Sequence, residues 1–128
     1  MKQMKSKRLT KEFMQEFNDY DFSKIKEKTI FLVGSNTRAK DYFSKIESIL
    51  QIKFKKLVSI CSIDGLLHKE KFSPEEWAIL QEIALKKLNL HEAILVLDVD
   101  GYIGDHSREE IETCNNLNKK VYYLSNLK

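Results

Sequence analysis

The stretch that decides the fold is residues 28–35, KTIFLVGS, in which apolar side chains follow one another without alternation. A strand with one face in water alternates apolar and polar residues, whereas a continuous apolar run is typical of a parallel strand buried on both faces. Further strands are predicted at residues 55–61 (KKLVSIC), 92–99 (EAILVLDV) and 119–125 (KKVYYLS). Together these segments predict a parallel sheet of four to five strands.

The segments between the strands have helical periodicity and supply helices that can cover both faces of the sheet. They are residues 38–51, 73–88 and 107–117. Strands that alternate with amphipathic helices predict an α/β three-layer sandwich of the flavodoxin or Rossmann type. No internal repeat or linker interrupts the pattern, so residues 28–128 are predicted to be a single domain.

Local signals mark where several elements begin and end. Residues 1–27 are expected to hold a frayed basic tail (MKQMKSKR) and a short helix with Thr10 as its N-cap. Ser73 and Glu76 have the spacing of a capping box at the start of the second core helix. The Asp-Gly pair at residues 64–65 predicts a turn after the second strand.

Composition excludes several classes of partner. The chain of 128 residues has a net charge of +3, and its lysines alternate with glutamates rather than forming a basic stripe with aromatic residues. We therefore expect no nucleic-acid polymer as a partner. There is no apolar run of ~18 residues and no apolar leader segment. These absences favour a soluble, cytoplasmic protein without a membrane partner.

The cysteines and histidines do not predict a metal site. Cys61 and Cys114 lie far apart, which is typical of reduced core residues rather than of a disulfide framework. His68, His91 and His106 have no short ligand spacing with one another or with the cysteines. We expect neither a bound metal nor an organic cofactor.

The loop after the first strand is the first candidate site. Ligands of open α/β sheets bind beyond the carboxyl ends of the strands, where VGSNTR (33–38) begins. Gly34 permits a tight turn, and the polar residues that follow offer hydrogen-bond donors at a helix N-terminus, which suits an anion such as phosphate. The alternative is that Ser35 and Thr37 only cap that helix.

The loop after the third strand, DVDGYIGDHS (98–107), is the second candidate site. Asp98 and Asp100 stand where a receiver domain carries its phosphorylated aspartate. A receiver also needs an acidic pair after the first strand to hold magnesium, and VGSNTR contains none. The glycines of this loop instead indicate room for a flat ligand.

Glu110 has an unusual direction on the helix that follows. At about 100° per residue it falls at the edge of the apolar face, whereas Glu109 points toward water. The apolar face itself is defined by Ile111, Cys114 and Leu117. A carboxylate that faces the core is costly unless it is compensated, and the first turn of a helix favours its ionised form.

Two interpretations of Glu110 remain open at this stage. A partly desolvated carboxylate that is held ionised at the carboxyl edge of the sheet is suited to act as a nucleophile. Alternatively, Glu110 completes a capping box with Ser107, three residues earlier. The two interpretations do not exclude each other.

These motifs resemble those of a known family. IFLVGSNTR (30–38), AILVLDVDGYIGDHSREEIE (93–112) and KKVYYLS (119–125) resemble the nucleoside 2-deoxyribosyltransferase-like superfamily. They are also similar to its 2'-deoxynucleoside 5'-phosphate N-hydrolases. The resemblance covers roughly residues 28–125, and the GYIGDHSREEIE block is its most specific part.

The resemblance implies roles for individual residues. Glu110 would attack the anomeric carbon of a nucleoside or nucleotide, and the loop after the first strand would bind the sugar or its 5'-phosphate. Asp98 and Asp105 would line the pocket and are the candidates for the acid that assists the leaving base. The implied substrate-binding residues are Gly34, Ser35, Asn36, Arg38, Asp100, Gly101, Tyr102 and Ser107.

Two departures from the family pattern keep a second function open. The family carries an aspartate on the second helix, where this chain has QEIALKKLNLHEA (81–93), with a lysine near the expected place and Glu82 a turn earlier. An aromatic hydroxyl expected after the first strand is missing, since Phe31 and Leu32 lie there. The alternatives are an enzyme that cleaves or transfers an N-glycosidic bond and a non-catalytic nucleotide-binding or protein-interaction module.

A homodimer is also expected. The resemblance implies a C2 pair whose neighbour helps to close the pocket. The helix predicted at 73–88 is apolar over more than one stripe, and such a helix usually contacts something besides its own sheet. Its apolar residues are Trp77, Ile79, Leu80, Ile83, Ala84 and Leu88.

Overall fold

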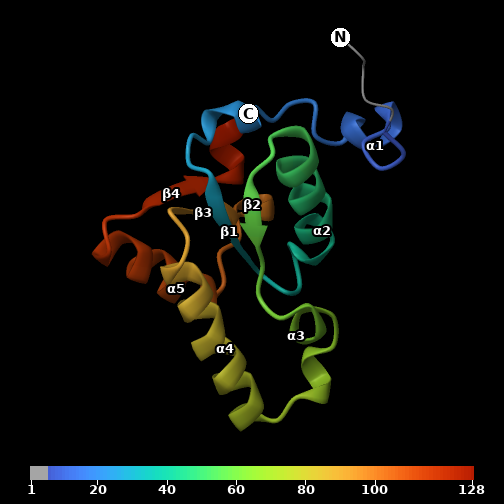
Figure 1. Cartoon of the computed structure of the whole chain (residues 1–128). Helices are drawn as coiled ribbons and strands as arrows, with labels where there is room; N and C mark the ends of the chain where they lie inside the picture. The colour runs from blue at the N-terminus through green and yellow to red at the C-terminus, as the bar shows by residue number, and fades with distance from the viewer. Residues whose placement is uncertain (1–5) are drawn as a thin grey trace.

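A computed structural model describes residues 6–128, and its centre is a four-stranded, all-parallel sheet. The strands lie in the order β2-β1-β3-β4 (Figure 1). Their bounds are β1 Thr29–Gly34, β2 Leu57–Ser59, β3 Ala93–Leu97 and β4 Lys120–Tyr123. The predicted α/β fold with a parallel sheet is confirmed, and the sheet has the smaller of the two expected sizes.

Helices cover both faces of the sheet, as the alternating pattern predicts (Figure 1). Helix α2 (Lys40–Ser48), which continues into the π-helical turn η2 (Ile49–Lys53), packs on one face, and α4 (Pro74–Asn89) and α5 (Asp105–Asn116) pack on the other. The remaining helical segments are short. They are α1 Lys11–Gln15, α3 Ile63–Leu67, η1 Phe22–Lys24, η3 Lys69–Lys71, η4 Val99–Gly101 and η5 Leu124–Leu127.

The central strand β1 shows why an unbroken apolar run was needed. Ile30 and Leu32 belong to the core layer beneath α2, and Phe31 and Val33 belong to the layer beneath α4 and α5. All four side chains are at most 1 % exposed. Because successive side chains of a strand point to opposite faces, a strand covered on both faces must be apolar at every position.

The segment before β1 contributes to the same core. Thr10 caps α1 as predicted, since its hydroxyl accepts a hydrogen bond from the Phe13 N–H. The helix ends at Gln15, and Phe17, Phe22 and Ile25 then pack into the α2-side core. Residues 1–5 of the expected basic tail lie outside the described residues.

The Asp-Gly pair at residues 64–65 is not a turn, so that prediction was wrong. Both residues lie inside α3, whose N-cap Ser62 accepts a hydrogen bond from the Gly65 N–H. A local turn signal was outweighed here by packing, because Gly65 lies against α4. A Cβ atom at Gly65 would lie 3.0 Å from Leu80 Cδ1 and 3.2 Å from Trp77 Cζ3.

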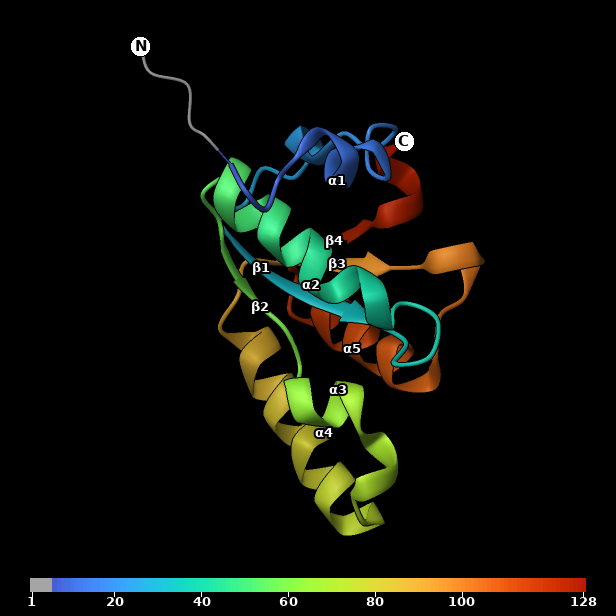
Figure 2. The same ribbon diagram turned by 90° about the vertical axis from the view of Figure 1, so that its right-hand side faces the viewer.

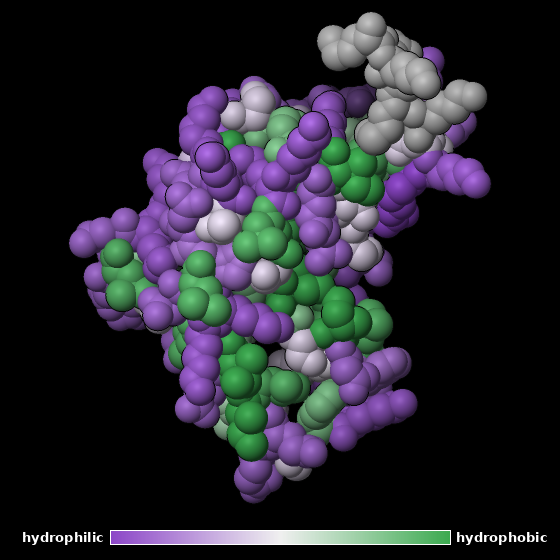
Figure 3. All heavy atoms as spheres, viewed as in Figure 1, coloured by the Kyte–Doolittle hydropathy of each residue, from purple (hydrophilic) through white to green (hydrophobic). Residues whose placement is uncertain are grey.

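Helix α3, η3 and the first half of α4 project beyond the carboxyl edge of the sheet (Figure 2). We call this projection the arm (residues 63–81). Apolar side chains gather on its surface (Figure 3), and the exposed ones on α3 and α4 are Ile63, Leu67, Ile79 and, just beyond the arm, Ile83. The second half of α4 is anchored in the core by Ala84 and Leu88.

Three features of the described chain bear on the expected chemistry. Cys61 and Cys114 are free thiols, and only Cys114 is fully buried. Within residues 6–128, no group of three His, Cys, Asp or Glu side chains is arranged to hold a metal ion. No helix in the same range is both long enough and apolar enough to span a bilayer.

Candidate functional site

A cleft opens at the carboxyl ends of β1 and β3, where the strand order reverses. The chain runs outward from β1 to β2 on one side and from β3 to β4 on the other, so a crevice forms between these two central strands. The cleft has a volume of about 350 Å³. Four parts of the chain form its walls. They are residues 34–37 at the end of β1 and just after it, the segment around α3 and η3 (Cys61, Ser62, Gly65, Leu66 and Lys69), one face of α4 (Trp77, Leu80, Gln81 and Ala84), and Tyr102, residues 104–107 and Glu110 before and within α5. We call it the Glu110 cleft.

Glu110 is the buried ionisable group of this cleft. Its side chain is only 7 % exposed, and among residues 6–128 it accepts or donates no hydrogen bond. Burial, and to a lesser extent the negative charge of Glu109, raises the pKa of Glu110 from 4.5 to about 8. At neutral pH the free protein therefore holds mostly the neutral carboxylic acid at this position.

Both earlier expectations about Glu110 need correction. The helix does not hold this carboxyl ionised at neutral pH, because α5 begins at Asp105 and Glu110 lies beyond its first turn. Glu110 also does not form a capping box with Ser107. The N-cap is Gly104, and no hydrogen bond joins Ser107 to Glu110 within the described chain. The inward direction deduced from the helix angle is confirmed by its burial.

The start of α5 presents hydrogen-bond donors to the cleft. Its first intrahelical bond runs from the Arg108 N–H to the Gly104 carbonyl, so the amides of residues 105–107 have no partner within the helix. Gly104 provides no side-chain cap. Ser107 is 3 % exposed and lines the cleft beside these amides. This arrangement suits an anionic or strongly polar group of a ligand.

Two backbone amides of the loop after β1 are already hydrogen-bonded to a serine of the same loop. The Ser35 hydroxyl accepts hydrogen bonds from the amides of Thr37 at 3.1 Å and Arg38 at 3.2 Å. Ser35 thus closes the turn before α2, while α2 itself starts at Lys40 without a side-chain cap. Asn36 lines the cleft, and the exposed Arg38 guanidinium lies 5.0 Å from the centre of the Tyr102 ring.

Helix α4 supplies a wall that sequence reasoning did not assign to the site. Trp77, Leu80, Gln81 and Ala84 line the cleft, and their spacing places them on one face of the helix. Glu82, the carboxylate considered for this helix, is exposed. The amphipathic spacing could have revealed this shared face, but not which surface it would meet.

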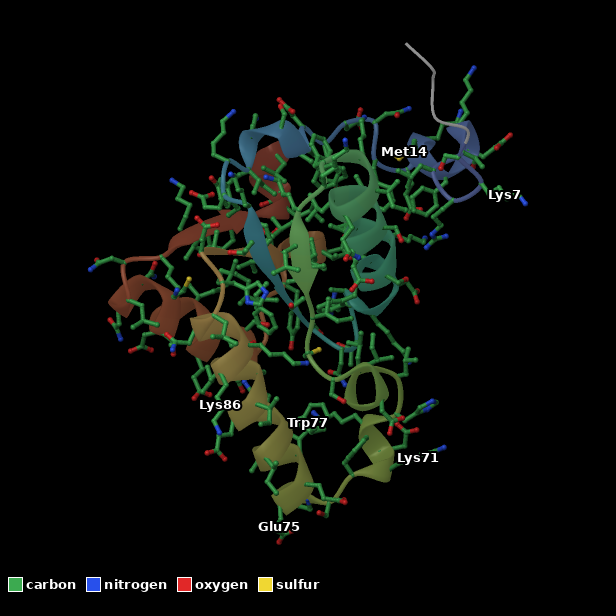
Figure 4. All side chains as sticks on the ribbon, viewed as in Figure 1. Lys7, Met14, Lys71, Glu75, Trp77 and Lys86 are labelled. Atoms are coloured by element: carbon green, nitrogen blue, oxygen red, sulfur yellow. The ribbon has the colours of Figure 1, made fainter. Side chains whose placement is uncertain are left out.

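Trp77 joins the arm to the start of α5. Its indole Nε1 donates a hydrogen bond to His106 Nε2 at 3.4 Å, and the two rings meet edge to face. Lys69 Nζ lies 5.0 Å from the centre of the indole, and the Phe72 ring packs 6.3 Å away. Figure 4 shows Trp77 on the side of α4 that faces α3 and Lys86 on the opposite side.

Cys61 lines the same cleft but is unsuited to act as a nucleophile. Burial and the nearby Glu110 carboxyl raise the pKa of the Cys61 thiol to about 11. Because the thiolate is the reactive form, this cysteine remains an inert thiol at neutral pH.

Asp98, Asp100 and Gly101 lie outside the Glu110 cleft. They line a separate depression, the Asp98 depression, together with Tyr20, Tyr42, Val99, Leu124, Ser125 and Lys128. Asp98 accepts hydrogen bonds from the Ser125 amide at 3.0 Å and from its hydroxyl at 2.5 Å. Gly101 has a φ of 75°, so its conformation explains the glycine without a ligand. Of the predicted carboxylates, the structure brings together only Glu110 and Asp105.

In comparisons with protein-family models, curated proteins and solved structures, nothing matches this chain. The family resemblance of the motifs therefore stays a prediction. The case for a function rests on the geometry of the Glu110 cleft.

Proposed function

We propose that the protein binds a nucleoside or nucleoside 5'-monophosphate in the Glu110 cleft and cleaves or transfers its N-glycosidic bond. The observation that carries this proposal is Glu110, a carboxyl group that is 7 % exposed and has no hydrogen-bond partner in the described chain. The side chain as a whole is buried, but its carboxyl oxygens remain accessible from the cleft. A carboxyl group with a strongly raised pKa that faces a cleft is typical of a functional site.

The size and chemistry of the cleft support a ligand of this class. A volume of about 350 Å³ suits a small molecule. Trp77, Leu80 and Tyr102 offer apolar and aromatic surface for a planar base. The free amides at the start of α5 suit a sugar hydroxyl or a phosphate.

In the proposed reaction, the ionised Glu110 carboxylate forms a bond to the anomeric carbon of the sugar. The C–N bond breaks at the same time, and the base leaves with the bonding electron pair and takes up a proton. Water then cleaves the glycosyl ester in a hydrolase, whereas a second base does so in a transferase. The raised pKa of about 8 leaves roughly a tenth of the carboxyl ionised at pH 7.

Of the two candidate acids, only Asp105 remains in position to protonate the leaving base. It is the first residue of α5 and lines the same cleft as Glu110, whereas Asp98 lies in the other depression. A positioned acid typically contributes ~10²–10⁴-fold to the rate.

One observation favours the alternative of a non-catalytic nucleotide-binding module. The cleft-facing position of α4 holds the amide of Gln81, so that helix offers no acid to the base. The two functions are separated by incubating the protein with deoxynucleosides and their monophosphates, while free base is measured by chromatography and binding by calorimetry. Base release supports the enzyme, and binding without base release supports the module. If no compound binds and none releases its base, the proposal is overturned.

The proposal includes a homodimer formed through the outer face of α4. Ile79 and Ile83 are 58 % and 40 % exposed there, while Trp77, Leu80, Ala84 and Leu88 face the cleft or the core. The apolar stripe is therefore narrower than the sequence suggested. Light scattering at tens of micromolar should give the mass of a dimer, and Ile83→Lys should give that of a monomer. A monomeric mass for the unmodified protein rejects this assembly.

A further inference from the structure

The side-chain amide of Gln81 contains an unsatisfied donor. In the part of the chain that the structure describes, Gln81 Nε2 is the one side-chain nitrogen or oxygen that is buried without a hydrogen-bond partner. An unpaired buried N–H lowers the stability of the folded state, so native proteins rarely retain one. The residue also lines the Glu110 cleft, and a rotation of its terminal amide about χ3 would present this N–H to an acceptor of a ligand there.

The position of Gln81 along α4 indicates which part of a ligand it would meet. Trp77 lies about one turn nearer the tip of the arm, and Ala84 lies about one turn deeper, where α4 enters the core. Glu110 reaches the same cleft from α5. A nucleoside whose sugar lies at Glu110 would therefore turn its base toward the apolar α4 wall and Gln81.

We infer that Gln81 selects the base, by donating a hydrogen bond from Nε2 to a carbonyl oxygen on the ring. This inference rests on the proposed function and adds the substrate class, namely nucleotides of oxo bases rather than of amino bases. A carbonyl oxygen satisfies the free N–H. An exocyclic amino group at the same place would set a second donor against it and leave both groups unpaired.

Two matched pairs of nucleotides test the inference. The monophosphates of deoxyinosine and deoxyadenosine differ in an oxo or amino group on the same purine frame, and those of deoxyuridine and deoxycytidine differ likewise on a pyrimidine. Dissociation constants are measured by calorimetry in a Glu110→Gln background, which prevents turnover. We expect at least one pair to bind, with the oxo member tighter by about tenfold or more.

Variants of Gln81 then assign the preference to its amide. Gln81→Leu removes the donor at similar volume and should reduce the difference within the pair to about twofold or less. Its melting temperature should stay level or rise, because an unpaired buried polar group is replaced by an apolar one. Gln81→Glu, which places acceptors where the donor was, should reverse the preference. Glu82→Gln, on the exposed neighbouring residue, is the control and should change neither the affinities nor the melting temperature.

Several outcomes overturn the inference. Equal affinities within both pairs, or tighter binding of the amino members, reject a donor at Gln81 while leaving nucleotide binding in place. A fall of several degrees in the melting temperature of Gln81→Leu shows that the amide is structural. If none of the four nucleotides binds, the proposed function falls as well as the inference.

Discussion

Asp98 and Glu110 lie on either side of the same loop, Asp98 directly after β3 and Glu110 in the middle of α5, and their carboxyl groups differ in whether the protein supplies hydrogen-bond partners. Asp98 follows β3 and accepts two hydrogen bonds from Ser125, which tie the start of η5 to the end of β3. Glu110 lies further along α5, is 7 % exposed and has no partner within residues 6–128. One carboxylate is satisfied by the protein, and the other faces a cleft.

This contrast separates a structural role from a functional one. A carboxylate that accepts hydrogen bonds from a neighbouring segment stabilises the fold that brings the two together. A buried carboxyl without such partners lowers stability, and such groups are commonly kept because activity requires them. Loss of Asp98 should therefore affect stability, and loss of Glu110 should affect chemistry.

The largest expected effect is on base release after Glu110→Gln. The substitution keeps the shape of the side chain and removes the nucleophile, so base release should fall by several orders of magnitude while nucleotide binding persists. Glu109→Gln is the matched control, because Glu109 is the adjacent residue and is exposed. Chromatography of the free base measures both variants. Equal rates in the two variants would remove Glu110 from the mechanism.

The pH dependence of base release should come next in magnitude. Because the pKa of Glu110 is about 8, the ionised fraction rises roughly tenfold per pH unit below that value. Base release by a carboxylate nucleophile should therefore increase roughly fiftyfold from pH 6 to pH 8, where half of the carboxyl is ionised, and level off above pH 8. A rate that falls over this range would mean that the protonated form of Glu110 acts instead.

The stability of the protein should depend on pH through the same group. The pKa of Glu110 is about 8 in the folded protein against an ordinary 4.5, so the folded state binds more protons between these values. The stability associated with the neutral carboxyl is thus fully present below pH 4.5 and is lost as the pH rises toward 8. Unfolding of the unmodified protein relative to Glu110→Gln should become easier by on the order of 2–3 kcal/mol from pH 5 to pH 7. The free energies of unfolding of the two proteins are measured by urea at each pH. A difference between them that does not change with pH would contradict a buried, neutral Glu110.

The smallest effect is expected for Asp98, and it is an effect on stability. Asp98→Ala removes the acceptor for both Ser125 donors and should lower the free energy of unfolding by about 1–3 kcal/mol. Ser125→Ala removes only the hydroxyl and should cost less. Urea unfolding measures both variants, and base release per folded molecule should be unchanged. A loss of base release in Asp98→Ala without a loss of stability would reverse the roles assigned to the two carboxylates.

The sequence by itself determined the elements and the edge at which they form a site. The apolar run of β1 indicated a sheet covered on both faces, and both hydrogen bonds of the predicted capping box between Ser73 and Glu76 are present. The inward direction of Glu110 also followed from its position on the helix. These features depend on residues that are close in the sequence, where helix and strand periodicity fixes direction.

Only the tertiary structure decided which of these groups have partners. Asp98 is satisfied by Ser125, which lies 27 positions away, and Trp77 meets His106 across 29 positions. Gln81 Nε2 has no hydrogen-bond partner, and no pattern in the neighbouring sequence indicates this. Periodicity tells which way a side chain points, but not what lies opposite it. Whether a polar group is satisfied depends on the packing of distant segments, and this is why the sequence could name both carboxylates but could not separate them.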